Sequence, residues 1–184
     1  YFFFQLVEKV DGGDIVLKIP IPISKEQGIK ELGCLVDQAG YEGAARILEM
    51  CRSGKVELTE QNESHGNFWR KRTIHDLMID FRLNSGQIEK LVRSFSSPYP
   101  GAVLVVKEKL IRAMNANVQK NELISSQNLE PGKILEVSED FIVVKTGDGA
   151  IQLFLKDMDP QEFKGVKYFH PPAYYWKTFS EEMG

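Results

Sequence analysis

The first 23 residues consist of two apolar runs separated by a polar turn. The runs cover residues 1–10 and 15–23, and the sequence Asp-Gly-Gly-Asp at 11–14 separates them. Because glycine adopts positive φ angles without steric cost, adjacent glycines at such a place indicate a tight turn between two strands. Residues 1–6 are rich in aromatic side chains, which favours a strand buried on both faces of a mixed or parallel sheet. Residues 15–19 are the second expected strand, ended by two prolines.

A long helix is predicted from Ser24 to Gly54. Ser24 and Gln27 have the spacing of a capping box, in which two side chains satisfy free backbone donors at a helix N-terminus. Gly54 is a typical C-terminal stop. Gly40 and Gly43 lie inside the helix and indicate either close packing or a local break. The apolar residues whose helical spacing predicts the buried face are Ile29, Leu32, Val36, Ala39, Ala44, Ile47, Leu48 and Cys51.

A polar connection and a second helix follow. Residues 55–71 are polar and rich in turn-forming residues, so we expect a connection on the surface. The second helix is predicted to begin near Asn84 or Ser85 and to end before residues 96–101, a bend with two prolines and a glycine. Its buried face follows the i, i+3, i+4, i+7 pattern and consists of Ile88, Leu91, Val92 and Phe95.

Beyond residue 101 the pattern changes to short apolar runs separated by turns. The expected strands are residues 102–106, 110–115, 132–137, 141–146 and 150–155. Short strands at regular spacing, without helical periodicity, are typical of a small β-barrel of the OB type. The last segment, from residue 164 onward, is crowded with aromatic residues between Tyr168 and Phe179. We expect this tail to pack on the barrel or on a second subunit, because exposed tails carry few aromatics.

Composition narrows the class of protein. A length of 184 residues allows one domain or two small ones, and the formal net charge of -3 gives no general attraction to nucleic acid or to an anionic membrane. Cys34 and Cys51 have neither a disulfide framework nor a metal-ligand spacing, so we expect buried free thiols in a reducing compartment. No apolar run approaches the roughly 20 residues that a membrane helix needs.

Four short motifs occur in a fixed order along the chain. They are Val10-Asp11-Gly12-Gly13-Asp14-Ile15, then Lys71-Arg72-Thr73, then Arg93 with Pro98-Tyr99-Pro100-Gly101-Ala102, and finally residues 131–135 with 147–150. As an ordered set they resemble the latter two-thirds of the N10-formyltetrahydrofolate-dependent formyltransferases, the family of methionyl-tRNA formyltransferase and the sugar N-formyltransferases. The resemblance implies an α/β fold in which residues 1–75 are the latter part of a Rossmann-like catalytic domain. Residues 76–184 would be a linker helix and an OB-like β-barrel domain with an aromatic tail.

The resemblance also implies the chemistry of the site. In the family, a substrate amine attacks the formyl carbon of the cofactor N10-formyltetrahydrofolate, and nearby donors stabilise the oxyanion. Asp11 matches the family's catalytic aspartate, and Val10, Asp11, Gly12 and Gly13 would line the folate pocket. A carboxylate in that place orients a histidine and raises the pKa of its imidazole. No metal is implied.

Two further residues are implied to bind the substrate. Arg72 would bind a phosphate, since arginine suits bidentate anion contacts, unless it is a solvated charge of the linker. Tyr99 either packs at the bend or contacts the nucleotide. We expect Arg93 to form a structural ion pair on a helix flank, and His65 to lie in a surface turn.

The other site residues of the family have no counterpart in this sequence. Neither Asn-x-His nor Ser-Leu-Leu-Pro occurs, and the histidines His65, His75 and His170 all follow Asp11. We therefore expect the sequence to be a fragment that lacks the first part of the site. By itself it should transfer no formyl group, because the oxyanion donors and the imidazole are missing.

Charge separates the possible substrates. From Asp76 onward the chain has about 13 Lys and Arg against about 15 Asp and Glu. Phosphate neutralisation supplies most of the affinity for tRNA, so this balance favours a nucleotide-linked amino sugar. The alternatives are methionyl-tRNA formyltransferase and a non-catalytic interaction module. We further expect a cytoplasmic protein with no membrane partner, and a homodimer formed through the C-terminal half.

Overall fold

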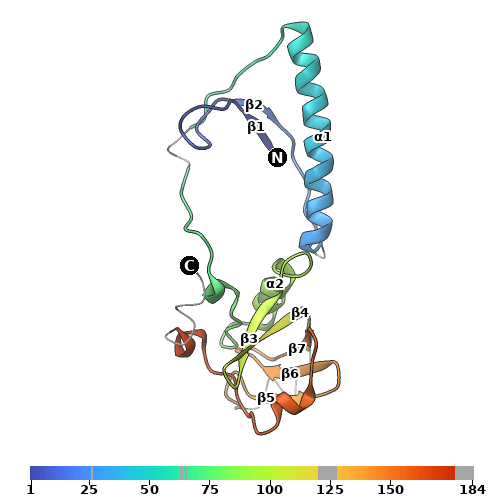
Figure 1. Ribbon diagram of the computed structural model, residues 1–184, viewed down its shortest axis with the longest axis vertical. Helices are drawn as coiled ribbons and strands as arrows, with labels where there is room; N and C mark the ends of the chain where they lie inside the picture. Colours follow the sequence, from blue (N-terminus) through green and yellow to red (C-terminus); the bar gives the residue numbers. More distant parts are fainter. Residues whose placement is uncertain (26, 63, 65, 120–127, 177–184) are drawn as a thin grey trace. The chain divides into compact units, whose positions relative to one another are not determined.

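The computed structural model describes residues 1–184 except 26, 63, 65, 120–127 and 177–184. It divides into two compact units, Tyr1–Arg70 and Lys71–Gly184. The first unit contains strand β1 (Phe2–Phe4), strand β2 (Ile15–Lys18) and helix α1 (Ile29–Ser53). The second contains helix α2 and a five-stranded sheet (Figure 1). None of the helices in the described part of the chain combines the length and the apolar character needed to cross a bilayer.

Strands β1 and β2 are joined by the predicted turn and pair antiparallel. The expected strand–turn–strand unit is therefore confirmed. The expected burial of β1 on both faces is wrong: Phe2 is 57% exposed and Phe4 is 39% exposed, whereas Phe3 is half-buried. Among the described residues β1 belongs to a two-stranded antiparallel sheet, which covers a strand far less than the central position of a mixed or parallel sheet would.

Helix α1 begins at Ile29 with Gly28 as its N-cap, five residues after the predicted start. The Gln27 side chain does accept a hydrogen bond from the Ser24 amide at 2.7 Å, but this contact closes a turn before the helix. The predicted end is confirmed, because Gly54 has a φ of 64° and its amide caps the last turn. Gly40 and Gly43 cause no break in the helix.

The buried face of α1 is narrower than predicted. Ala39 and Gly43 are its buried residues, whereas Ala44 and Leu48, which we expected on this face, are exposed. Cys34 and Cys51 are also exposed, so the expectation of buried thiols is wrong. The sheet of the first unit has only two described strands, which is too few to cover the whole of the predicted apolar face of α1.

The second unit confirms the later helix and all five strands. Its elements are α2 (Ser85–Ser94), β3 (Ala102–Val106), β4 (Lys109–Gln119), β5 (Ile134–Val137), β6 (Phe141–Lys145) and β7 (Ala150–Leu155). The strands form one antiparallel sheet in the order β3-β4-β7-β6-β5. Among the described residues no ladder joins β3 to β5, so the predicted closure into an OB-like barrel is not confirmed.

Helix α2 covers the core of this unit. Asn84 and Gln87 form a capping box at its start, and Ile88 and Val92 are fully buried, as the apolar pattern predicts. Arg93 pairs with Glu89 at 3.1 Å on the flank of the helix, which confirms its structural role. The buried core to which Ile88 and Val92 belong also includes Phe81, Ala102, Leu104, Ala113, Ile142, Val144, Ile151 and Leu153.

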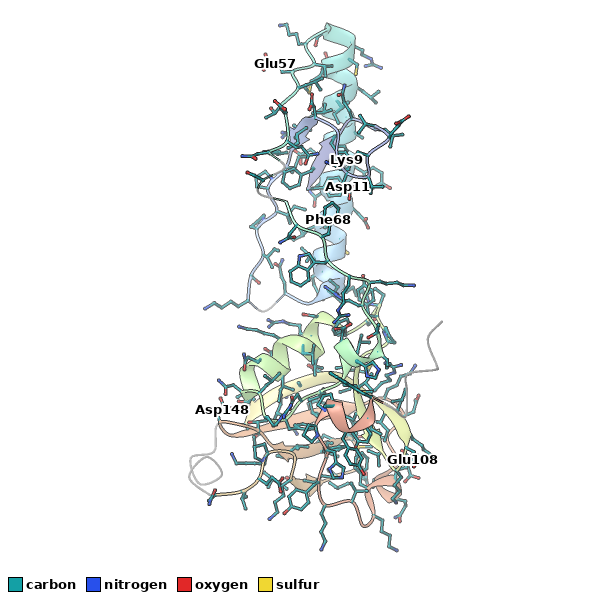
Figure 2. The ribbon with its side chains drawn as sticks, turned by 90° about the vertical axis from the view of Figure 1, so that its left-hand side faces the viewer. Lys9, Asp11, Glu57, Phe68, Glu108 and Asp148 are labelled. Atoms are coloured by element: carbon teal, nitrogen blue, oxygen red, sulfur yellow. The ribbon has the colours of Figure 1, made fainter. Side chains whose placement is uncertain are left out.

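Asp148, in the turn between β6 and β7, holds the N-terminus of α2 on the sheet (Figure 2). Its Oδ1 accepts hydrogen bonds from the Ser85 amide at 2.8 Å, the Ser85 hydroxyl at 3.0 Å and the Thr146 hydroxyl at 3.1 Å. These donors, the backbone N–H of Ser85 first, lower the pKa of the Asp148 carboxyl below its ordinary value of 3.8. The ionised form is therefore the one that the folded protein stabilises.

Substitution of Asp148 by alanine is expected to lower the free energy of unfolding by about 0.5–1.5 kcal/mol, the range for an ordinary hydrogen bond, because the side chain is exposed and solvent screens its charge. The contribution of the carboxylate is fully present above its unfolded pKa and is lost as the pH falls through the lowered folded pKa. Calorimetric unfolding at pH 7 and pH 3 measures both effects. Asp140→Ala, in the exposed turn between β5 and β6, is the control. Equal losses in the two variants would contradict the role of Asp148.

Two segments outside the sheet lie along its first and last strands. The Ile79 amide donates to the Val103 carbonyl of β3 at 2.9 Å, next to a bridge between Met78 and Val103. At the other side, the Ile134 amide of β5 donates to the Lys167 carbonyl at 3.0 Å. Met78 and Val103 also belong to a smaller buried cluster on the face away from α2.

The aromatic tail packs on the sheet unit as far as it is described. Phe169 is buried, and its ring lies 5.1 Å from that of Phe81 in the main core. His170 and Tyr174 stack at 4.2 Å, and Tyr174 remains 67% exposed. Packing of the tail on its own unit is thus confirmed for Phe169. Phe179 lies outside the described residues, and the homodimer stays a prediction.

Candidate functional site

Asp11 lies in the connection between β1 and β2, on the outside of a closed turn (Figure 2). The Gly12 amide donates to the Lys9 carbonyl at 3.1 Å, and the Gln5 amide donates to the Asp14 carbonyl at 2.9 Å. Asp11 itself has a φ of 55°, in the left-handed region that aspartate tolerates better than most residues. The turn therefore presents an exposed carboxylate on a backbone that is closed on both sides of it.

The two glycines of the turn do not adopt the positive φ angles for which glycine was expected there. The positive φ belongs to Asp11, whereas neither Gly12 nor Gly13 is among the residues with positive φ. Gly13 is instead required by space, because a Cβ there would lie 1.9 Å from the Gln5 carbonyl oxygen. At Gly12 a Cβ would meet the flexible side chain of Lys9 at 2.8 Å. The close approach of the Gln5 backbone thus requires a glycine at position 13.

A second segment, far along the sequence, holds this loop. The Gln61 side-chain amide donates to the Asp11 carbonyl at 2.8 Å and to the Gly13 carbonyl at 2.5 Å. Thr59 and Ile15 exchange two backbone hydrogen bonds, of 2.8 and 2.9 Å. Sequence reasoning missed Gln61, since a glutamine in a polar connection carries no motif. An open hollow of about 450 Å³ adjoins it, lined by Glu60, Gln61, Asn62 and Ser64.

The turn offers a ligand two kinds of contact, the charged Asp11 carboxylate and an apolar side chain beside it. Val10 is 79% exposed, so an apolar side chain stands next to the carboxylate on the same turn. The described histidines, His75 and His170, belong to the second unit, and His65 lies outside the described residues. The imidazole that the family places beside its aspartate is thus not supplied by the described part of the first unit. Among the described residues, no three His, Cys, Asp or Glu side chains gather closely enough to hold a metal ion.

Arg72 and Tyr99 belong to the second unit, near the C-terminal end of α2. The Arg72 guanidinium lies over the ring of Phe95, with its central carbon 5.7 Å from the ring centre. The following residue, Thr73, caps the 3-10 helix Ile74–Leu77. Tyr99 is 51% exposed, and its amide donates to the Ser96 carbonyl at 2.9 Å. The structure thus places the Arg72 guanidinium over the Phe95 ring and leaves about half of the Tyr99 side chain accessible, as a nucleotide contact would require.

Solved structures of similar fold include HypX from Aquifex aeolicus and a sugar formyltransferase. A substituted HypX is 19% identical, with a TM-score of 0.62 over 97% of this chain and 30% of its own. HypX in complex with tetrahydrofolic acid is 18% identical, with a TM-score of 0.57 over 97% of this chain and 30% of its own. WlaRD, a sugar 3N-formyl transferase in the presence of dTDP and 5-N-formyl-THF, is 14% identical, with a TM-score of 0.62 over 86% of this chain and 55% of its own.

At such identities the similarity shows the fold alone. This chain spans 30% of the length of the HypX structures and 55% of that of WlaRD.

The comparison with family models identifies the family. The family model for "Formyl transferase, C-terminal domain" matches residues 72–166, which begin at the predicted Arg-Thr motif and run through all five strands of the second unit. Because that match covers more than half of the 184 residues, the chain belongs to the formyl transferase family and carries its C-terminal domain.

Proposed function

We propose that this chain provides the aspartate loop and the C-terminal domain of an enzyme that transfers a formyl group from N10-formyltetrahydrofolate to the amine of a nucleotide-linked amino sugar. The observation that carries the proposal is Asp11, an exposed carboxylate on a turn held by backbone hydrogen bonds and by Gln61, in a chain of the formyl transferase family. The sequence around it, residues 10–15, resembles the aspartate loop of the family.

The reaction needs proton transfer as well as positioning. The amine nitrogen of the substrate attacks the formyl carbon, and the carbonyl oxygen becomes an oxyanion in the tetrahedral intermediate. The bond between that carbon and N10 then breaks, N10 gains a proton, and the attacking nitrogen loses one. Asp11 would accept the proton of the nitrogen, directly or through water, or would orient the imidazole that does so. The asparagine and histidine of the family's site are absent from this sequence.

The turn also offers a surface for the cofactor. The exposed side chain of Val10 is suited to the flat ring system of a folate, and the backbone from Val10 to Gly13 can approach it closely, since glycine has no side chain. HypX was solved with tetrahydrofolic acid and WlaRD in the presence of 5-N-formyl-THF. Both support a folate-type cofactor, and the N10-formyl form is part of the proposal.

A sugar nucleotide fits the second unit better than tRNA does. Arg72, whose guanidinium lies over the Phe95 ring, can present this group to a diphosphate, for which one bidentate contact and a few amides suffice. Binding of tRNA instead requires a broad basic face, whereas residues from Asp76 onward are slightly acidic in balance. The dTDP in the WlaRD crystals gives independent support for a nucleotide-linked substrate.

The substrate class is tested by a side-by-side assay of the full natural chain with N10-formyltetrahydrofolate. The acceptors are charged initiator tRNA and a panel of nucleotide-linked 3-amino and 4-amino sugars. We expect at least one sugar to be formylated and the tRNA to be bound no better than a generic polyanion. The Asp11→Asn variant serves as the catalytic control. Efficient formylation of tRNA with no sugar accepted would overturn the choice of substrate, and no transfer to any amine would favour a non-catalytic module.

A further inference from the structure

We propose that Gln61 is a positioning residue for the reaction, because it holds the backbone of the turn at the carbonyls of Asp11 and Gly13. The inference rests on the proposed function of the Asp11 loop. Gln61 lies 50 residues from Asp11 and 48 from Gly13, in a segment that the family motifs do not include. Its role follows from the hydrogen bonds of one side chain.

The Gln61 amide group makes its two contacts with one nitrogen. Nε2 carries two hydrogens, and the carbonyl oxygens of Asp11 and Gly13 lie 2.8 and 2.5 Å from it. Both carbonyls therefore point toward the same nitrogen, and the peptide units between them are held from outside the loop. An acceptor such as a carboxylate in place of the amide would leave both carbonyls without their donor.

The loop needs this external support because its own sequence specifies little. Asp11 has a positive φ, which residues with a Cβ seldom adopt, and it is followed by two glycines, the residues with the most backbone freedom. The Gly12 amide makes a local bond of 3.1 Å to Lys9. The Thr59–Ile15 pair anchors the segment of Gln61 two residues earlier, so the amide is presented from a fixed backbone.

A loosely held loop would change the rate more than the affinity. The proton acceptor of a reaction must lie within hydrogen-bonding reach of the reacting nitrogen, and a displacement of about 1 Å can reduce the rate on the order of a hundredfold. The proposed nucleotide contacts at Arg72 and Tyr99 belong to the second unit and would remain. Loss of Gln61 should therefore lower kcat and leave the KM for the amino-sugar acceptor nearly unchanged.

The test compares Gln61→Ala and Gln61→Glu with Gln38→Ala, an exposed glutamine of α1, in the full natural chain. Gln61→Glu keeps the size of the side chain and removes the donor. For both Gln61 variants we expect kcat to fall about tenfold to a hundredfold, the KM for the amino sugar to change less than about twofold, and the Gly12 amide to exchange about tenfold faster. Gln38→Ala should match the wild type in all three. Thermal unfolding should be nearly the same in every variant.

Three results separate the inference from the proposed function. Wild-type kcat in both Gln61 variants would overturn the positioning role while the proposed function stands. A wild-type chain that formylates no amine would overturn the proposed function and, with it, any role of Gln61 in that reaction. In that case the exchange rate of Gly12 still decides whether Gln61 holds the loop, because hydrogen exchange requires no turnover. If the unfolding temperature of both Gln61 variants fell together with their kcat, Gln61 would contribute to stability alone.

Discussion

Replacement of Asp11 by asparagine is expected to lower the kcat of formyl transfer by about 10²–10⁴-fold, the range for loss of a positioned acid–base group. Asparagine has the same shape and tolerates the left-handed conformation that Asp11 adopts, so the backbone of the turn is retained. The change removes the negative charge that would accept the proton or orient the imidazole. Steady-state kinetics on the full natural chain measure the effect, with folate affinity as a second readout.

Asp14→Asn is the matched control for Asp11→Asn. It removes one negative charge from the same loop, and it keeps the backbone carbonyl that accepts from the Gln5 amide. We expect its kcat to remain within a few-fold of the wild type, because Asp14 does not match the catalytic position. Circular dichroism should show the same fold in both variants. A near-normal kcat in Asp11→Asn, or an equal loss in Asp14→Asn, would reduce Asp11 to a residue of the turn.

Replacement of Gly43 by alanine is expected to destabilise the first unit, although alanine is the better helix former. A Cβ at Gly43 would lie 2.0 Å from the ring of Phe3, so the ring must move out of its packed position. Overpacking of this kind costs about 1–3 kcal/mol, which outweighs the roughly 1 kcal/mol that alanine contributes in a helix interior. The free energy of unfolding in urea, followed by a probe in the first unit, measures the balance.

Gly33→Ala is the control on the same helix. A Cβ at Gly33 meets no atom within 4 Å, so the substitution gains helix propensity without a clash. We expect it to raise the free energy of unfolding by about 0.5–1 kcal/mol. The two variants should therefore change stability in opposite directions. Stabilisation by both would mean that Phe3 does not pack against Gly43 in solution.

Local sequence signals predicted the second unit well. The strands at 102–106 and 150–155 were placed with their bounds as observed, and the capping box at Asn84 marks the start of α2. In this unit the apolar pattern agrees with a core that the unit forms by itself, since Ile88 and Val92 are fully buried. The apolar pattern of a helix predicts its buried face correctly when the sheet that covers this face belongs to the same unit.

The first unit was predicted less well, for two physical reasons. Apolar content at Phe2 and Phe4 predicted burial, but burial depends on which other strands are present, and β1 is described with one partner strand. The start of α1 was placed too early, because the Ser24–Gln27 contact also occurs in an isolated turn. Strand pairing and cap geometry are decided by tertiary contacts that a single sequence does not contain.

The candidate site was also predicted only in part. The glycine turn and its aspartate were identified from local sequence, and the resemblance gave Asp11 its role. Neither the positive φ at Asp11 nor the two bonds from Gln61 could be predicted, because the first depends on the closed loop and the second on a residue 50 positions away. Long-range hydrogen bonds of side chains leave no periodic pattern in a sequence.

The segments along β3 and β5 limit how the second unit can associate with other proteins. An open sheet normally presents unpaired backbone groups at its two edges, where a strand from another chain can add and where aggregation begins. Here the Val103 carbonyl of β3 already accepts from Ile79, and the Ile134 amide of β5 already donates to Lys167. At these positions strand addition is blocked. The exposed rings of Tyr174 and Trp176 offer a contact surface of a different kind, made of side chains rather than of backbone groups.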